Sequence, residues 1–121
     1  MSLARFKSVD TSNTFWGEIL NSIVQRCVHA GQVKKIFVFG SFSTKTMTEA
    51  SDLDIAVIVA DEENPREFRR RLPSPLAQWP LDLIIVRESR FNERKTFGGV
   101  LFDVNEDGIE LYPRWSLEDH K

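Results

Sequence analysis

The hydrophobic positions along the chain fall into two patterns, one typical of helices and one typical of strands. Between Thr14 and Ala30, apolar residues recur in pairs about every four residues, which places them on one stripe of a helix. Gly31 follows as a natural helix stop, and Ser12 or Asn13 is suited to cap the start. We therefore predict an amphipathic helix over this stretch. Its apolar stripe consists of Phe15, Trp16, Ile19, Leu20, Ile23, Val24, Cys27 and Val28.

Short apolar runs bounded by turn-forming residues predict buried strands along the rest of the chain. Helical patterns separate the strands. One opens with Asn64 as its cap and Pro65 in its first turn, and it stops near Leu72. Ser89 is suited to cap another, which Gly98-Gly99 interrupts. This alternation predicts one α/β (α+β) domain over residues 1–121, with a small mixed β-sheet flanked by helices. The predicted strands are Lys35–Phe39, Leu53–Ala60, Leu81–Val86 and Ile109–Tyr112, and the last helical stretch runs over Val100–Asn105.

Composition and charge narrow the class of protein. The 121 residues carry a formal net charge of -2, whereas a dedicated nucleic-acid-binding domain is more often basic, so we do not expect a nucleic-acid partner. No apolar run approaches the roughly 20 residues of a membrane span, and the first residues contain no secretory h-region. The single cysteine, Cys27, excludes an internal disulfide, and its place on the apolar stripe indicates a core residue. We expect a cytoplasmic protein without membrane association.

The sequence also contains a basic run and a Trp-Pro pair, to which we assign no function. Arg69-Arg70-Arg71, together with Arg66, forms a basic run on a short predicted helix, and we interpret it as a solvated helix face. Trp79 stands directly before Pro80, and we interpret it as a packing residue.

Candidate chemistry lies in residues 38–59, VFGSFSTKTMTEASDLDIAVIV. Two carboxylates, Asp52 and Asp54, stand at the start of a predicted buried strand, where unpaired charge is costly. Because strand side chains alternate, both would point to the same side and raise each other's pKa. A divalent cation such as Mg²⁺ would remove that conflict. Asp82 begins the next strand and joins this cluster if the two strands are neighbours, and three acids can hold two metal ions.

Gly40-Ser41, directly after the first predicted strand, supplies a complementary half of a site. Glycine lets the backbone approach a ligand closely, successive N–H groups in such a turn attract phosphate, and the Ser41 hydroxyl adds a donor. Acids for a metal ion on one side and phosphate donors on the other predict a site for a nucleoside triphosphate. Each feature alone has a plainer interpretation, such as a simple turn or solvated carboxylates. Their combination at this spacing is far less common.

This combination resembles the nucleotidyltransferase superfamily that includes DNA polymerase beta and kanamycin nucleotidyltransferase. The matching residues are Gly40-Ser41, a ten-residue spacer, Asp52-Leu53-Asp54, and Asp82 on a later strand. The chain is most similar to the minimal nucleotidyltransferase group of small single domains. The resemblance implies the nucleotidyltransferase fold, Mg²⁺ or Mn²⁺ as cofactor, and transfer of a nucleotidyl group from a triphosphate to a hydroxyl. The segments that add support are Phe91-Asn92-Glu93-Arg94, Gly98-Gly99 and Gly108-Ile109-Glu110-Leu111-Tyr112.

The resemblance also assigns roles to residues and reveals one departure. Many minimal members carry Ala-Arg-Gly where this chain has Ser43-Thr44-Lys45. Lys45 could supply the missing positive charge to the nucleotide, as a point charge rather than a planar fork, or it could be a solvated loop lysine. The implied roles are phosphate binding for Gly40 and Ser41, binding of both metal ions for Asp52 and Asp54, and, for Asp82, completion of the catalytic metal site and support of the deprotonated attacking hydroxyl.

The resemblance finally bears on the acceptor of the nucleotidyl group. Minimal members are commonly encoded beside a small helical protein of the HEPN family, and such pairs look like toxin–antitoxin systems. In them the nucleotidyltransferase can attach AMP from ATP to a tyrosine of the toxin. We therefore expect a HEPN-type partner and an antitoxin role. Two alternatives stay open: transfer to a small hydroxyl compound such as an aminoglycoside, and a non-catalytic module that covers its partner.

Overall fold

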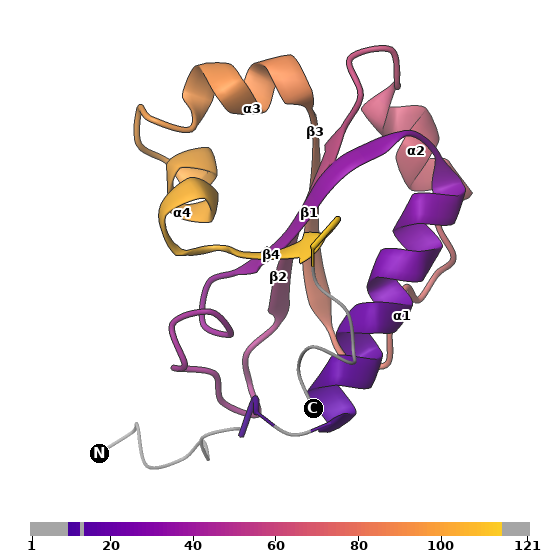
Figure 1. Cartoon of the computed structure of the whole chain (residues 1–121). Coiled ribbons are helices and arrows are strands. Elements are labelled where there is room, and N and C mark those ends of the chain that lie inside the picture. The colour runs from indigo at the N-terminus through magenta and orange to yellow at the C-terminus, as the bar shows by residue number, and fades with distance from the viewer. Residues whose placement is uncertain (1–9, 13, 115–121) are drawn as a thin grey trace.

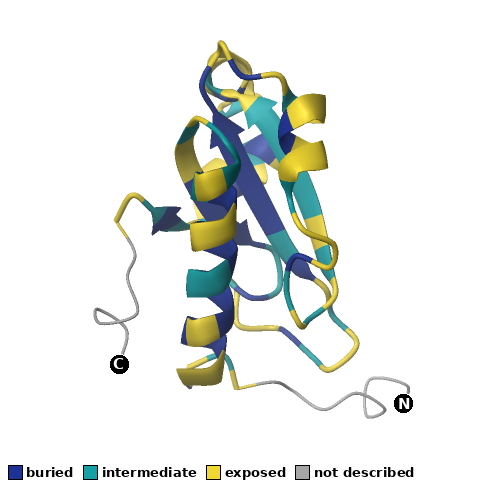
Figure 2. Ribbon diagram, turned by 90° about the vertical axis from the view of Figure 1, so that its right-hand side faces the viewer, coloured by how far each residue is buried: buried dark blue, intermediate teal, exposed yellow. Residues whose placement is uncertain are grey.

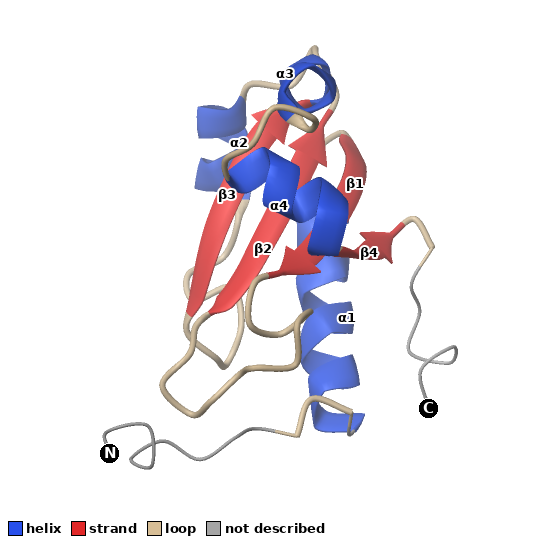
Figure 3. Ribbon diagram, turned by 90° about the vertical axis from the view of Figure 1, so that its left-hand side faces the viewer, coloured by secondary structure: helices blue, strands red, loops and turns tan. Residues whose placement is uncertain are grey.

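The computed structural model of the chain describes residues 10–12 and 14–114. Its helices and strands, in chain order, are α1 Thr14–Ala30, β1 Val33–Phe39, β2 Leu53–Val59, α2 Pro65–Arg71, β3 Leu81–Arg87, α3 Glu88–Arg94, α4 Val100–Asp107 and β4 Ile109–Tyr112. The strands form one four-stranded sheet in the order β3-β2-β1-β4. Figure 1 shows this sheet with α1 on one side and α3 and α4 on the other. Helix α1 covers one face of this sheet, and α4 lies in front of the other face (Figure 3).

The sheet is mixed, as the sequence predicted. Strand β1 is antiparallel to both β2 and β4, whereas β2 and β3 are parallel. A parallel pair needs a crossover connection, and α2 lies in the segment that links β2 to β3. The result is an α+β fold in which the two strands that carry the predicted acids are neighbours.

Strand alternation divides the core between the two faces of the sheet. On β2, Leu53, Ile55 and Val57 pack into the cluster that contains the α1 stripe, and Ala56 and Ile58 pack with residues of α3 and α4. Figure 2 shows the buried sheet between exposed helix surfaces. No helix in the described ranges is long and apolar enough to cross a membrane.

Helix α1 has the predicted bounds, and most of its apolar stripe is buried. Cys27 is fully buried, as the sequence predicted, and burial raises the pKa of its thiol to about 12. Phe15 is the exception, with 47% of its surface exposed, and its ring packs edge-on against Trp16. The face of α1 that packs into the core is therefore almost the face that the periodicity predicts.

The predicted caps had different outcomes. Asn64 caps α2 as predicted, because its Oδ1 accepts bonds from the backbone N–H groups of Arg66 (2.9 Å) and Glu67 (3.2 Å). The prediction that Ser89 caps the next helix is wrong, because α3 already begins at Glu88. The backbone N–H of Ser89 instead donates to Oδ1 of an aspartate in the loop after β2, Asp61, at 2.9 Å.

The arginine run on α2 is exposed, and two of its side chains also contact neighbouring elements. Arg70 is exposed and pairs with Glu67 at 3.0 Å, which agrees with the predicted solvated face. Arg69, however, donates to the carbonyl of Leu83 on β3 (2.8 Å), and Arg71 donates to the carbonyl of Ala30 at the end of α1. All three side chains are exposed, as the solvated-face interpretation expects, and those of Arg69 and Arg71 also reach backbone acceptors on neighbouring elements.

Candidate active site

Asp54 and Asp82 stand opposite each other on the parallel strands β2 and β3. Residues in register on parallel strands share a face of the sheet, so the two carboxylates lie on the same side. For Asp54 this is the face away from α1, because its neighbours Leu53 and Ile55 pack into the α1 core. The strands are neighbours, which is the condition for Asp82 to join the other acids.

Asp52 lies just outside β2, which begins at Leu53. This start is the predicted one, and the two carboxylates remain close enough for the charge of Asp52 to act on Asp54. Burial, followed by the negative charges of Asp82 and Asp52, raises the pKa of the half-buried Asp54 carboxyl above its usual range. The three carboxylates thus share one electrostatic neighbourhood at the end of the sheet.

The chemistry of these carboxylates suits a hard divalent cation. Mg²⁺ and Mn²⁺ prefer oxygen ligands, and either ion would offset the repulsion felt by Asp54. In the part of the chain that the structure describes, no three acidic, histidine or cysteine side chains are gathered closely enough to hold a metal ion as they stand. The donor set fits such an ion by type and neighbourhood, and holding it would require the three carboxylates to come closer together.

Gly40 brings the end of β1 against these acids. Its φ is +70°, a left-handed conformation that glycine adopts without steric cost. The preceding residue, Phe39, is paired with Asp54 across the two strands. A Cβ atom added at Gly40 would come within 3.0 Å of Oδ2 of Asp54, closer than real Cβ contacts allow. Both the backbone conformation and the close carboxylate therefore require glycine at this position.

The loop that follows Gly40 begins with turns over residues 41–45. The carbonyl of Gly40 accepts a bond from the backbone N–H of Thr44 (3.1 Å), and the carbonyl of Ser41 accepts one from that of Thr46 (2.9 Å). The Thr44 hydroxyl also donates to the Gly40 carbonyl, at 3.1 Å. These bonds hold the half-buried Ser41 at the start of the loop, next to Gly40 and hence beside the acids.

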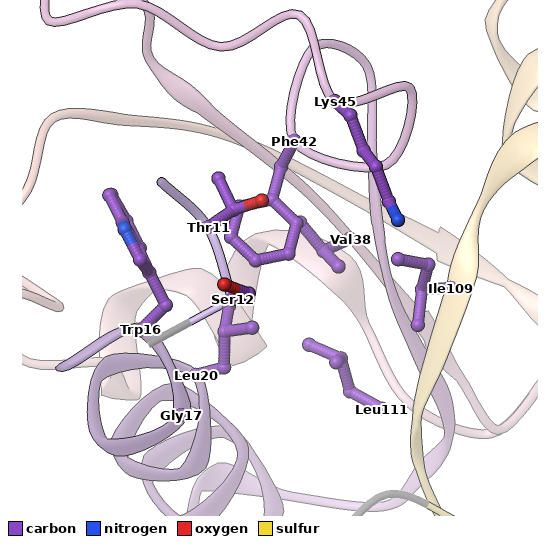
Figure 4. Close-up of a pocket in the computed structure, with 10 residues that line it drawn as sticks. All are labelled: Thr11, Ser12, Trp16, Gly17, Leu20, Val38, Phe42, Lys45, Ile109 and Leu111. Carbon is purple, nitrogen blue, oxygen red and sulfur yellow. The ribbon is translucent and has the colours of Figure 1, made fainter. Parts of the chain in front are cut away.

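Lys45 is the predicted site residue that the structure does not bring to the acids. Its side chain lines a cavity of about 290 Å³ between the start of α1 and β4 (Figure 4). Val38 and Leu111, which share this lining, belong to the core on the α1 face, opposite to Asp54. Lys45 also has a φ of 63°, the left-handed region that glycine suits. Glycine is the residue that many minimal nucleotidyltransferases carry here, so the loop has a glycine-like backbone without the glycine.

Trp79 packs as predicted, and it also makes a hydrogen bond that the sequence did not indicate. Its ring packs edge-on against Trp16, with centroids 4.8 Å apart, so packing is part of its role. In addition, its indole Nε1–H donates to the carbonyl of Ser51 at 2.8 Å, and Ser51 directly precedes Asp52. The sequence shows a tryptophan just before the strand of Asp82, but nothing in that pattern reveals the acceptor of its N–H.

Comparison with known proteins gives the class to which this fold and site belong. Residues 21–114 match the family described as "Polymerase beta, Nucleotidyltransferase", so the chain belongs to this family of nucleotidyltransferase domains. A crystal structure of a candidate nucleotidyltransferase from Sulfolobus solfataricus has a similar fold, with a TM-score of 0.58, 16% sequence identity and coverage of 84% of each chain. Among the curated proteins, none matches this chain. The resemblance to minimal nucleotidyltransferases is thereby confirmed.

Proposed function

We propose that this protein is a metal-dependent nucleotidyltransferase that transfers AMP from ATP to a hydroxyl group on a protein partner. The observation that carries the proposal is the register of Asp54 with Asp82, combined with the close approach of Gly40 to Asp54. The acids and the turn proposed to bind phosphate are thus close together. Membership of a nucleotidyltransferase family, which generally uses Mg²⁺ and a nucleoside triphosphate, supports the same reaction class.

In this proposal the acids hold the cofactor and the turn holds the substrate. Asp52 and Asp54 would bind Mg²⁺ or Mn²⁺, and Asp82 would complete the catalytic metal site and favour the deprotonated acceptor hydroxyl. When bound, the ion supplies positive charge that stabilises the charge developing on the phosphates. Gly40 and Ser41 would bind the phosphates through backbone N–H groups and the serine hydroxyl. The acceptor oxygen bonds to the α-phosphorus, the bond from that phosphorus to the bridging oxygen breaks, and pyrophosphate leaves.

For the acceptor we propose a tyrosine of a HEPN-type helical protein, with the present chain as its antitoxin. Asp52 and Asp82 are exposed, so a hydroxyl carried on another protein could reach them. The cavity of Figure 4, in contrast, contains none of the three acids and offers no obvious place for a small acceptor beside them. Because phosphoryl-type transfer depends mainly on positioning, a docked partner could supply the alignment that this small domain does not.

The reaction can be tested by incubating the purified chain with Mg²⁺, ATP and the HEPN-type protein encoded beside it. Intact-mass spectrometry should then show the partner gaining one or more adenylyl groups, on tyrosine. The variant with Asp52→Asn and Asp54→Asn should abolish this gain and keep the fold, whereas Asp107→Asn, an exposed acid at the end of α4, should leave it unchanged. Rapid ATP consumption with an aminoglycoside and no partner would instead favour a small-molecule acceptor.

A second candidate function is a non-catalytic module that silences its partner by covering it. Two observations favour it: the acids are not gathered as metal ligands within the described residues, and Lys45 lines a cavity on the opposite face of the sheet. The double variant of Asp52 and Asp54 separates the two functions. If it still protects cells from the partner, and the partner never gains mass beside the parent protein, the binding module is the better description.

A further inference from the structure

The backbone on both sides of Asp52 is bonded to one dipeptide, Trp79-Pro80. Before Asp52, the carbonyl of Ser51 accepts the indole N–H of Trp79 at 2.8 Å. After Asp52, the backbone N–H of Leu53 donates to the carbonyl of Pro80 at 2.9 Å. These two bonds are made by adjacent residues, so together they restrict both the position and the rotation of the Asp52 backbone.

The same dipeptide leads directly into the strand that carries Asp82. Strand β3 begins at Leu81, immediately after Pro80, and Leu81 pairs with Leu53 in the parallel register. Trp79-Pro80 therefore ties the backbone of Asp52 to the strand of Asp82. The exposed Asp52 side chain depends on this backbone for its place relative to the other acids, because it lies outside β2.

Ser51 is also held from its other side. Its backbone N–H donates to the carbonyl of Thr48 at 3.0 Å, and its Oγ accepts a bond from the backbone N–H of Thr48, also at 3.0 Å. This reciprocal turn limits the movement of the loop before Ser51. The hydrogen bond from the Trp79 indole to Ser51 therefore connects a hydrogen-bonded turn to the segment that leads into β3.

Trp16 connects this arrangement to the phosphate-binding turn. Its ring, which is 2% exposed, contacts the ring of Trp79 at 4.8 Å between centroids and that of Phe42 at 5.6 Å, both edge-on. Phe42 follows Ser41 directly and shares the cavity of Figure 4 with Trp16. Edge-on aromatic pairs of this kind contribute beyond their buried area, so the two halves of the candidate site rest on one aromatic cluster.

From these contacts we propose that Trp79 is a positioning residue for the metal centre: its indole N–H holds the Ser51–Leu53 backbone so that Asp52 stays in reach of Asp54 and Asp82. This inference rests on the proposed function, because it concerns metal binding by these acids. Residues that orient metal ligands through hydrogen bonds commonly change metal affinity or activity by about 10–100-fold when they are replaced. Replacing Trp79 should therefore weaken the affinity for metal and nucleotide, whereas replacing a packing residue should not.

The test compares Trp79→Phe, which keeps an aromatic ring and removes the N–H donor, with Ile23→Val, a buried change in the same core cluster. Calorimetric titration with Mn²⁺ and ATP measures the dissociation constant, urea unfolding measures stability, and hydrogen exchange by NMR measures opening at the Leu53 amide. We expect Trp79→Phe to bind Mn²⁺–ATP about tenfold more weakly and to exchange the Leu53 amide faster. Ile23→Val should lose stability with unchanged affinity.

A second variant covers the case in which Trp79→Phe does not fold. Benzothienylalanine at position 79 keeps the shape of the indole and replaces its N–H by sulfur, and it should show the same loss of affinity. Unchanged Mn²⁺–ATP affinity in a folded variant, while Asp54→Asn weakens binding, overturns the positioning role and leaves the proposed function intact. If Asp54→Asn itself binds Mn²⁺–ATP as tightly as the parent protein, the proposed metal site fails and this inference fails with it.

Discussion

The Gly40 backbone and the Asp54 carboxylate are in such close approach that no Cβ atom fits between them. Gly40 directly follows β1 and Asp54 lies in β2, so this contact joins the predicted phosphate-binding half of the candidate site to its acidic half. A side chain at position 40 would have to displace Asp54, and with it the carboxylate that Asp82 faces.

Replacing this glycine should therefore affect both stability and binding. We expect Gly40→Ala to cost about 1–2 kcal/mol for the left-handed backbone, with a further loss from displacing Asp54. Gly98→Ala is the matched control, because Gly98 also has a positive φ (+99°) but nothing lies within 4 Å of an added Cβ. Urea unfolding and Mn²⁺–ATP titration should show that only Gly40→Ala weakens binding. Equal effects of the two substitutions would contradict a specific role for the contact.

The raised pKa of Asp54 predicts how stability changes with pH. The folded protein holds the proton on the Asp54 carboxyl more tightly than the unfolded chain does, so protonated Asp54 favours the folded state. This stabilisation is fully present below the ordinary carboxyl pKa and is lost as the pH rises through the raised value. Asp54→Asn should thus be more stable than the parent protein near pH 7, and the difference should shrink near pH 3. Urea unfolding across this range measures it.

The same variant should respond differently to a cation. Mn²⁺ should stabilise the parent protein near pH 7, because it offsets the repulsion among the acids, and should stabilise Asp54→Asn much less. A parent protein that gains no stability from Mn²⁺, with or without ATP, would argue against the metal centre.

Two substitutions at Lys45 distinguish the effect of its left-handed backbone from the effect of its charge. Lys45→Gly should stabilise the protein by about 0.5–1 kcal/mol, because the left-handed backbone costs a lysine about 1–2 kcal/mol and glycine loses part of that gain to chain entropy. Lys45→Ala keeps the backbone cost and removes the same charge. Since Lys45 lines the cavity on the α1 face, we expect both variants to keep ATP affinity within about twofold. A loss of about tenfold or more in both would support the charge role for the triphosphate.

Glu63 is a buried acidic residue outside the candidate site, and we expect its side chain to contribute to the free energy of unfolding. It is 8% exposed, its Oε1 accepts the backbone N–H of Gln32 at 2.9 Å, and its Oε2 pairs with Arg71. The Gln32 N–H above all, and then Arg71, lower its pKa against the opposing effect of burial. Its contribution is therefore present above the ordinary glutamate pKa and is lost as the pH falls through the lowered value.

Thermal or urea unfolding tests this expectation with two matched variants. Glu63→Gln should cost about 1–2 kcal/mol near pH 7, because a charge-assisted pair is lost in a buried place, and should cost less in acid. Glu67→Gln removes the exposed pair with Arg70 and should change stability by less than about 0.5 kcal/mol. A similar cost for both variants would mean that burial adds nothing to the Glu63 pair.

Much of the fold could be predicted from the sequence because its signals are local. The apolar stripe of α1 and the short strand β4 have their predicted bounds, and Asn64 caps α2 through bonds to residues two and three positions away. Ser89, predicted as a cap, lies inside α3 instead. Contacts between distant residues were not predicted: the backbone N–H of Ser89 donates to Asp61, and the exposed Arg69 donates to the carbonyl of Leu83.

In the candidate site, too, some features depend on nearby residues and others on segments far apart in the chain. By itself the sequence determined the family, through the spacing of Gly40-Ser41 and Asp52-Leu53-Asp54, and the presence of an acid at the start of a later strand. Only the tertiary structure decided that β2 and β3 are parallel neighbours with Asp54 opposite Asp82, and that Trp79 bonds to Ser51. It also decided that Lys45 lines a cavity on the other face. Side-chain period and turn chemistry depend on nearby residues, whereas strand register and hydrogen-bond partners depend on how segments far apart in the chain pack together.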